Sequence, residues 1–185
     1  MSKRNFKIYR GDDERGELVN YKCEVTEGMV VLDAIHKIQS NQANDLACRW
    51  NCKAGKCGSC GVEINGKPKL ACMTRMNEFE EEQTVVITPL KSFPVIKDIV
   101  SDVSWNYKQN EKIIPFSPSK KDKEKDFVMM QKDIDRVQHF RKCIECYLCQ
   151  NVCHVIRDND TKENFVGPRF MTRLASLEMH PYDRA

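Results

Sequence analysis

The spacing of the cysteines constrains this chain more than any other feature. The stretch CRWNCKAGKCGSC places Cys52, Cys57 and Cys60 with four and two residues between them, and Cys72 follows after eleven more. This is the plant-type spacing for a 2Fe-2S cluster, in which each iron takes two bridging sulfides and two protein sulfurs. One loop can supply the first three thiolates, and the fourth must come from a neighbouring strand. We therefore expect these four cysteines to bind a 2Fe-2S cluster.

The residues around these cysteines favour iron-sulfur over zinc. Gly55, Gly58 and Gly61 punctuate the loop, which lets the backbone fold tightly and aim N–H groups at sulfides and thiolates. Structural zinc usually pairs two CxxC-like knuckles, and this cluster contains only one. Cys48 breaks the four-residue spacing, so we interpret it as a bystander. Cys23 alternates with apolar residues on a predicted strand and is interpreted as a core residue.

A second run of cysteines lies further along the chain. Cys143, Cys146, Cys149 and Cys153 follow the spacing C-x2-C-x2-C-x3-C of bacterial ferredoxins, which bind 4Fe-4S clusters. In two-cluster proteins the fourth cysteine of such a run ligates the other cluster, and this chain then lacks ligands to complete both. His154 stands where a proline normally follows. The residues alone leave the role of Cys153 open between fourth 4Fe-4S ligand and ligand of another cluster.

Composition indicates a folded protein and excludes several function classes. Hydrophobic residues make up 41% of the 185 residues and charged residues 31%, which is ordinary for a soluble protein. The formal net charge of +3 is too small to indicate nucleic-acid binding. No stretch approaches the roughly 18 consecutive apolar residues of a membrane span, and the N-terminus lacks the apolar core of a signal peptide. We expect a cytosolic chain whose clustered cysteines bind metal rather than form disulfides.

The first ninety residues predict a small α+β domain. Apolar and polar residues alternate on both sides of GDDERGE, which predicts a hairpin over residues 5–25. Apolar residues recur at helical spacing over residues 31–38, and the Asn65-Gly66 turn marks a second hairpin. Residues 85–88 supply a late, β-branched strand. This order of elements is typical of a β-grasp domain.

Past Pro89 the pattern becomes helical. Apolar residues between 96 and 103 repeat at three- and four-residue intervals, which predicts a helix and no further strands. Residues 134–140 predict a helix that leads into the second cysteine run, and Gly167-Pro168 predicts the start of a last helix. We therefore expect two domains: residues 1–92, carrying the 2Fe-2S site, and residues 93–185, helical and carrying the second run.

With both motifs in this order, the chain resembles the iron-sulfur subunit of succinate dehydrogenase and fumarate reductase. RWNCKAGKCGSCGVEINGKPKLACMTRM looks like that family's 2Fe-2S segment, and CIECYLCQNVC looks like its second-cluster segment. FVGPRFMTRLASLEMHPYD resembles the helix that follows in the actinobacterial branch. The resemblance covers essentially the whole chain. It implies a plant-ferredoxin-like β-grasp domain followed by an α-helical ferredoxin-like domain.

The resemblance also implies ligands, cofactors and partners. The implied ligands are Cys52, Cys57, Cys60 and Cys72 for 2Fe-2S, Cys143, Cys146 and Cys149 for 4Fe-4S, and Cys153 for 3Fe-4S. Family members usually continue into a segment with three further cysteines, so we expect a truncated chain or a fragment, with 3Fe-4S only where that segment is present. The family passes electrons between an FAD-containing flavoprotein subunit and quinone in a membrane anchor. That role implies a peripheral subunit on the cytoplasmic side of the membrane, without catalytic residues.

Two other interpretations remain open from the residues. One is a free-standing two-cluster electron carrier for a soluble oxidoreductase, in which the second run completes one 4Fe-4S site unaided. The other is a zinc-stabilised interaction module. His36, His139 and His180 have no carboxylate or serine constellation nearby in the sequence, and we assign them no catalytic role.

Overall fold

The structure is a computed structural model that describes residues 2–159 and 164–185. Contacts divide the chain into two compact units. The first unit comprises Met1–Val103 and Glu145–Val152, and the second comprises Ser104–Ile144 and Cys153–Ala185. A short piece of the second cysteine run therefore belongs with the first unit. The expected domains, residues 1–92 and 93–185, stay a prediction, because contacts do not measure which segments fold on their own.

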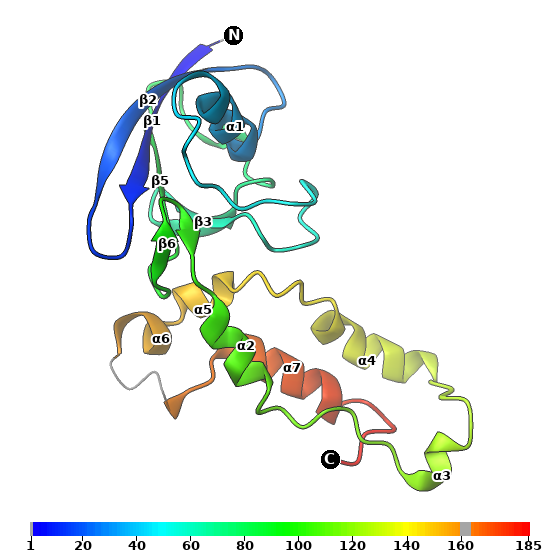
Figure 1. The fold of residues 1–185 in the computed structure, drawn as a ribbon. Coiled ribbons are helices and arrows are strands. Elements are labelled where there is room, and N and C mark those ends of the chain that lie inside the picture. Colours follow the sequence, from blue (N-terminus) through cyan, green and yellow to red (C-terminus); the bar gives the residue numbers. More distant parts are fainter. Residues whose placement is uncertain (1, 160–163) are drawn as a thin grey trace. The chain divides into compact units, whose positions relative to one another are not determined.

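A mixed five-stranded sheet forms the centre of the first unit (Figure 1). The strands are β1 (Ser2–Gly11), β2 (Gly16–Val25), β3 (Gly61–Ile64), β4 (Lys67–Leu70) and β5 (Val85–Thr88). Their order across the sheet is β2-β1-β5-β3-β4. β1 pairs antiparallel with β2 along its whole length and parallel with β5, and β3 pairs antiparallel with β4 and β5. The predicted hairpins and the late strand are confirmed.

One helix completes the core of this unit. Alternate residues of β1 point inward, and Phe6 and Ile8 are fully buried. Helix α1 (Val31–Asn41) places an apolar face, including Leu32 and Ile35, in the same core. The Asp33 carboxylate accepts the backbone N–H of Val30 at 3.1 Å, which satisfies a free amide at the helix start. The unit is the predicted α+β, β-grasp fold.

The turn between β3 and β4 takes the conformation that its sequence predicts. Asn65 and Gly66 have φ angles of 48° and 74°, as a two-residue hairpin turn of type I′ requires. The Asn65 side chain also accepts the backbone N–H of Val86 at 2.7 Å. The hairpin is followed by the short 3-10 helix η1 (Met76–Glu78). The β3–β4 hairpin itself lies between Cys60 and Cys72, so its register fixes how these two residues approach each other.

The prediction of a helix between residues 96 and 103 is wrong. A small antiparallel pair, β6 (Val95–Lys97) and β7 (Val100–Ser101), occupies this segment instead. Asp98 in the turn has a φ of 51°, a left-handed conformation that a helix cannot include. The apolar residues here are β-branched, which suits a strand as well as a helix face, so spacing alone could not separate the two.

The second unit is helical. Its helices are α2 (Ser104–Asn110), α3 (Lys120–Lys123), α4 (Gln131–Arg141), α6 (His154–Asp158) and α7 (Pro168–Glu178), while α5 (Leu148–Val152) belongs to the first unit. α4 packs against α7, with Val137 and Phe170 buried. Gly167, with a φ of 89°, precedes Pro168 at the first position of α7. The two predicted helices, before the second cysteine run and after Gly167, are confirmed.

Candidate metal centre

The β3–β4 hairpin brings Cys60 and Cys72 together. Cys60 directly precedes β3, Cys72 follows β4, and Gly61 pairs with Leu70 across the hairpin. The backbone N–H of Ala71 donates to the carbonyl of Cys60 at 3.0 Å, and that of Cys72 donates to Sγ of Cys60 at 3.4 Å. Both thiols are buried. The hairpin thus supplies two neighbouring sulfur atoms from two strand ends.

The loop before β3 folds around Cys52. The backbone N–H groups of Ala54 and Lys56 both donate to Sγ of Cys52, at 3.4 and 3.3 Å. Lys53 and Gly55 have positive φ angles of 53° and 63°, which turn successive N–H groups toward one side. Such a concavity of N–H groups favours negative charge. The loop therefore fits the charge of a thiolate-bound iron-sulfur cluster.

The cysteines in and beside this site differ in the pKa that their surroundings give to the thiol. Hydrogen bonds, chiefly from the Ser59 side chain, lower the pKa of Cys57 to about 6. Burial raises the pKa of Cys60 to about 12, and burial alone raises the pKa of Cys48 to about 11. Metal ligation requires the thiolate. Binding at Cys60 must therefore release the proton of its thiol, whereas Cys57, with its lowered pKa, is already a thiolate at neutral pH.

The structure does not gather the other candidate ligands at one point. Among the described residues, no three His, Cys, Asp or Glu side chains converge closely enough to hold a metal ion. Cys52 and Cys57 lie half-buried in the loop. In the second run, Cys146 and Cys149 belong to the first unit, while Cys143 and Cys153 belong to the second. All ten cysteines lie in the described ranges as free thiols, and the assignment of eight of them to clusters stays a prediction.

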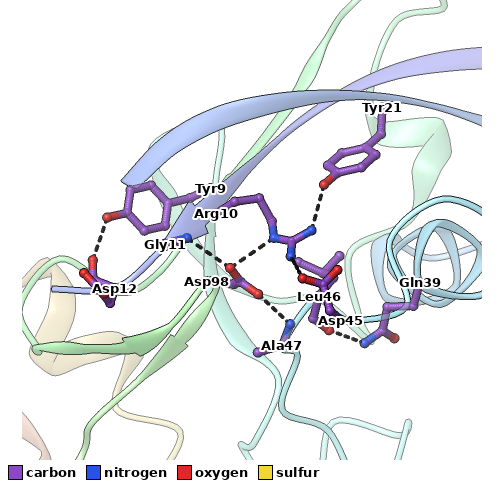
Figure 2. Close-up of polar contacts among 10 residues, drawn as sticks. All are labelled: Tyr9, Arg10, Gly11, Asp12, Tyr21, Gln39, Asp45, Leu46, Ala47 and Asp98. Atoms are coloured by element: carbon purple, nitrogen blue, oxygen red, sulfur yellow. Dashed lines mark hydrogen bonds and ion pairs between the residues drawn. The ribbon is translucent and has the colours of Figure 1, made fainter. Parts of the chain in front are cut away.

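A buried carboxylate anchors the chain that leads into the cysteine loop (Figure 2). Asp98 accepts hydrogen bonds from Arg10 Nε and the Gly11 amide, both at 3.0 Å, and from the Ala47 amide at 2.7 Å. The same guanidinium donates to the Tyr21 hydroxyl at 2.9 Å and to Asp45 at 2.5 Å. Sequence reasoning missed this hub. Its members lie far apart along the chain, and no local pattern marks them.

Helix length bears on how the chain could meet a membrane. Over residues 2–159 and 164–185, no helix is long and apolar enough to cross one.

A family model matches the part of the chain that contains the first cysteine site. Residues 5–108 match the family model described as "2Fe-2S iron-sulfur cluster binding domain". This match includes Cys52, Cys57, Cys60 and Cys72, together with β2, β3, β4, β5 and all of β1 after its first three residues.

Chains of succinate dehydrogenase and fumarate reductase are also similar to this chain. A chain of the Mycobacterium smegmatis Sdh1 complex in the apo form is 55% identical, with a TM-score of 0.96, over all of this chain and 77% of that one. The fumarate reductase iron-sulfur subunit of Mycobacterium tuberculosis is 33% identical over 80% of this chain and 60% of its own length. The mitochondrial succinate dehydrogenase [ubiquinone] iron-sulfur subunit of Candida glabrata is 32% identical over 89% and 67%.

Other curated relatives are much longer than this chain. It spans about a third of three of them, covering 32%, 34% and 35% of their lengths. The similarity to the Sdh1 chain extends through both cysteine runs, because it covers this chain completely. The chain belongs to the family of iron-sulfur subunits of succinate dehydrogenases and fumarate reductases.

Proposed function

We propose that this chain is the electron-transfer subunit of a succinate dehydrogenase or fumarate reductase complex. It relays electrons between a flavoprotein subunit that carries FAD and quinone in a membrane anchor. The similarity to a chain of the Sdh1 complex, which is 55% identical and covers the whole of this chain, carries this proposal. The subunit is peripheral, on the cytoplasmic side of the membrane, and its partner subunits hold it there.

The first cysteine site supports the cofactor side of the proposal. Cys52, Cys57, Cys60 and Cys72 would hold a 2Fe-2S cluster, which takes up and releases one electron at a time. The N–H groups of Ala54 and Lys56 already face Sγ of Cys52, and hydrogen bonds to ligand sulfur stabilise the more negative, reduced state. The loop thereby contributes to the reduction potential of the site.

The second cysteine run supports a further site. Cys143, Cys146 and Cys149 would hold a 4Fe-4S cluster, following the bacterial-ferredoxin spacing. Cys153 would be the first ligand of a 3Fe-4S cluster where further cysteines are present, or the fourth ligand of the 4Fe-4S cluster. None of these residues performs substrate chemistry. Oxidation and reduction of the dicarboxylate belong to the flavoprotein subunit.

Co-expression with a flavoprotein subunit tests the proposal. We expect the two chains to purify together under anaerobic conditions. In the complex, succinate should reduce the 2Fe-2S cluster and so produce its electron paramagnetic resonance signal. The control is the chain alone, in which dithionite but not succinate produces that signal. A cluster-loaded chain that never associates with the flavoprotein, or that succinate never reduces in the complex, would support a free-standing electron carrier instead.

A further inference from the structure

The first unit includes eight residues from the middle of the second cysteine run. Residues 145–152, with helix α5, pack among the residues of the 2Fe-2S domain. Gln150 and Asn151 in α5 are completely buried there, although both are polar. Polar side chains are buried at a cost unless they find hydrogen-bond partners, so their partners show what holds the segment in place.

Asn151 forms a buried link to two parts of the 2Fe-2S domain. Its amide nitrogen donates to Glu63 Oε1 at 2.8 Å, and its amide oxygen accepts the backbone N–H of Ser92 at 2.9 Å. The Ser92 hydroxyl also donates to the backbone carbonyl of Asn151, at 3.4 Å. Glu63 lies on β3, three residues after Cys60, and is completely buried as well. One side chain thus ties α5 to β3, the strand that begins directly after Cys60.

Gly58 is a second point of close approach between the two cysteine segments. It lies between Cys57 and Cys60 and has a φ of 72°. A Cβ added to Gly58 would lie 2.7 Å from the Cα and 2.9 Å from the backbone nitrogen of Cys146. Backbone atoms cannot move aside as a flexible side chain can. Only glycine therefore lets the first cysteine loop rest on the backbone of the second run.

We propose that Asn151, through Glu63 and Ser92, is a positioning residue that holds residues 145–152 of the second cysteine run against the first cysteine loop at Gly58. This inference rests on the proposed function, in which electrons pass between clusters held by the two segments. The link joins rigid elements, because Glu63 is on a central strand and Asn151 on a helix. It fixes how far Cys146 and Cys149 lie from Cys57 and Cys60.

Exchanging the carboxylate and amide groups between positions 63 and 151 tests the link in the reconstituted holoprotein. Asn151→Asp sets a second carboxylate against Glu63, so we expect amide hydrogen exchange in residues 145–152 to quicken by about tenfold or more. Glu63→Gln keeps an acceptor oxygen and should leave exchange near the wild-type rate. The double variant Glu63→Gln/Asn151→Asp restores the contact with donor and acceptor reversed, and we expect it to restore protection.

Rescue separates a specific pair from general packing. If Asn151→Asp does not fold, recovery of folded protein in the double variant is the same positive result. A double variant no better than Asn151→Asp alone, or an Asn151→Asp protein with wild-type exchange, overturns the proposal.

The glycine contact has its own matched pair of variants. Gly55→Ala and Gly58→Ala both place a methyl group at a positive φ in the cysteine loop. The methyl at position 55 meets the flexible Met73 side chain, whereas the one at 58 meets the Cys146 backbone. We expect only Gly58→Ala to quicken exchange in residues 145–152. Equal effects of the two would show that loop strain, not the Cys146 contact, matters.

Electron paramagnetic resonance connects the link to cluster spacing. A second paramagnetic cluster nearby speeds relaxation of the reduced 2Fe-2S signal, so Asn151→Asp should make that signal saturate at lower microwave power, and the double variant should reverse this. Unchanged saturation in a variant with faster exchange overturns the positioning role. A wild-type holoprotein without a second cluster counts against the proposed function, and the exchange comparison still decides the link.

Discussion

Cys57 and Cys48 lie near each other in the sequence but in opposite environments. Cys57 accepts hydrogen bonds that favour its thiolate, whereas burial alone raises the pKa of Cys48 to about 11. We expect Cys57→Ser to abolish or strongly alter the visible absorption of the 2Fe-2S cluster, and Cys48→Ser to leave it intact. Absorption spectra of the two proteins, prepared anaerobically side by side, decide this. A bleached Cys48→Ser protein would mean that the ligand register is wrong.

Asp98 offers a second comparison at single residues. Asp98 and Asp45 both pair with the guanidinium of Arg10, but the Asp98 side chain is 2% exposed and the Asp45 side chain is 63% exposed. In Asp98→Asn an NH2 group replaces one carboxylate oxygen and cannot accept the amide hydrogen bond of Gly11 or Ala47, so a buried donor loses its partner and the free energy of unfolding should fall by about 2 kcal/mol. Asp45→Asn should change it little, because water screens exposed pairs. Urea unfolding of both variants gives the comparison, and equal midpoints would show that the hub does not anchor the loop.

The sequence predicted correctly those elements in which turn residues and hydrophobic periodicity indicate the same structure. The Asn65-Gly66 turn, the strands around it and helix α1 follow from turn chemistry and periodicity within a few residues. The β6–β7 pair did not follow, because β-branched residues at helical intervals also suit a strand. The deciding feature is the left-handed turn at Asp98, which is stabilised by hydrogen bonds from distant segments.

Two isoleucines test this difference between elements. Ile35 in α1 is fully buried, whereas Ile96 in β6 is 54% exposed. Ile35→Ala leaves a cavity in the core and should cost about 3 kcal/mol of unfolding free energy. Ile96→Ala should cost no more than about 0.5 kcal/mol, as surface substitutions do. Thermal or urea unfolding measures both, and a large loss at Ile96 would favour the helical arrangement that the sequence suggested.

For the whole molecule, the sequence predicted the order of elements and the cysteine motifs but not the contacts between distant segments. Glu63 and Asn151 are 88 residues apart, as are Arg10 and Asp98, and nothing in their neighbourhoods marks them as partners. Buried polar pairs of this kind depend on the complete fold. The association of residues 145–152 with the first unit therefore emerged only from the structure.

The central claim is that the cysteines of this chain bind iron-sulfur clusters. Iron and acid-labile sulfide measured per chain after anaerobic purification, with electron paramagnetic resonance on the reduced protein, test it most directly. The account predicts iron and sulfide in equal amounts, at least those of one 2Fe-2S cluster, and a signal that appears on reduction. A colourless protein that contains zinc and no acid-labile sulfide would contradict it.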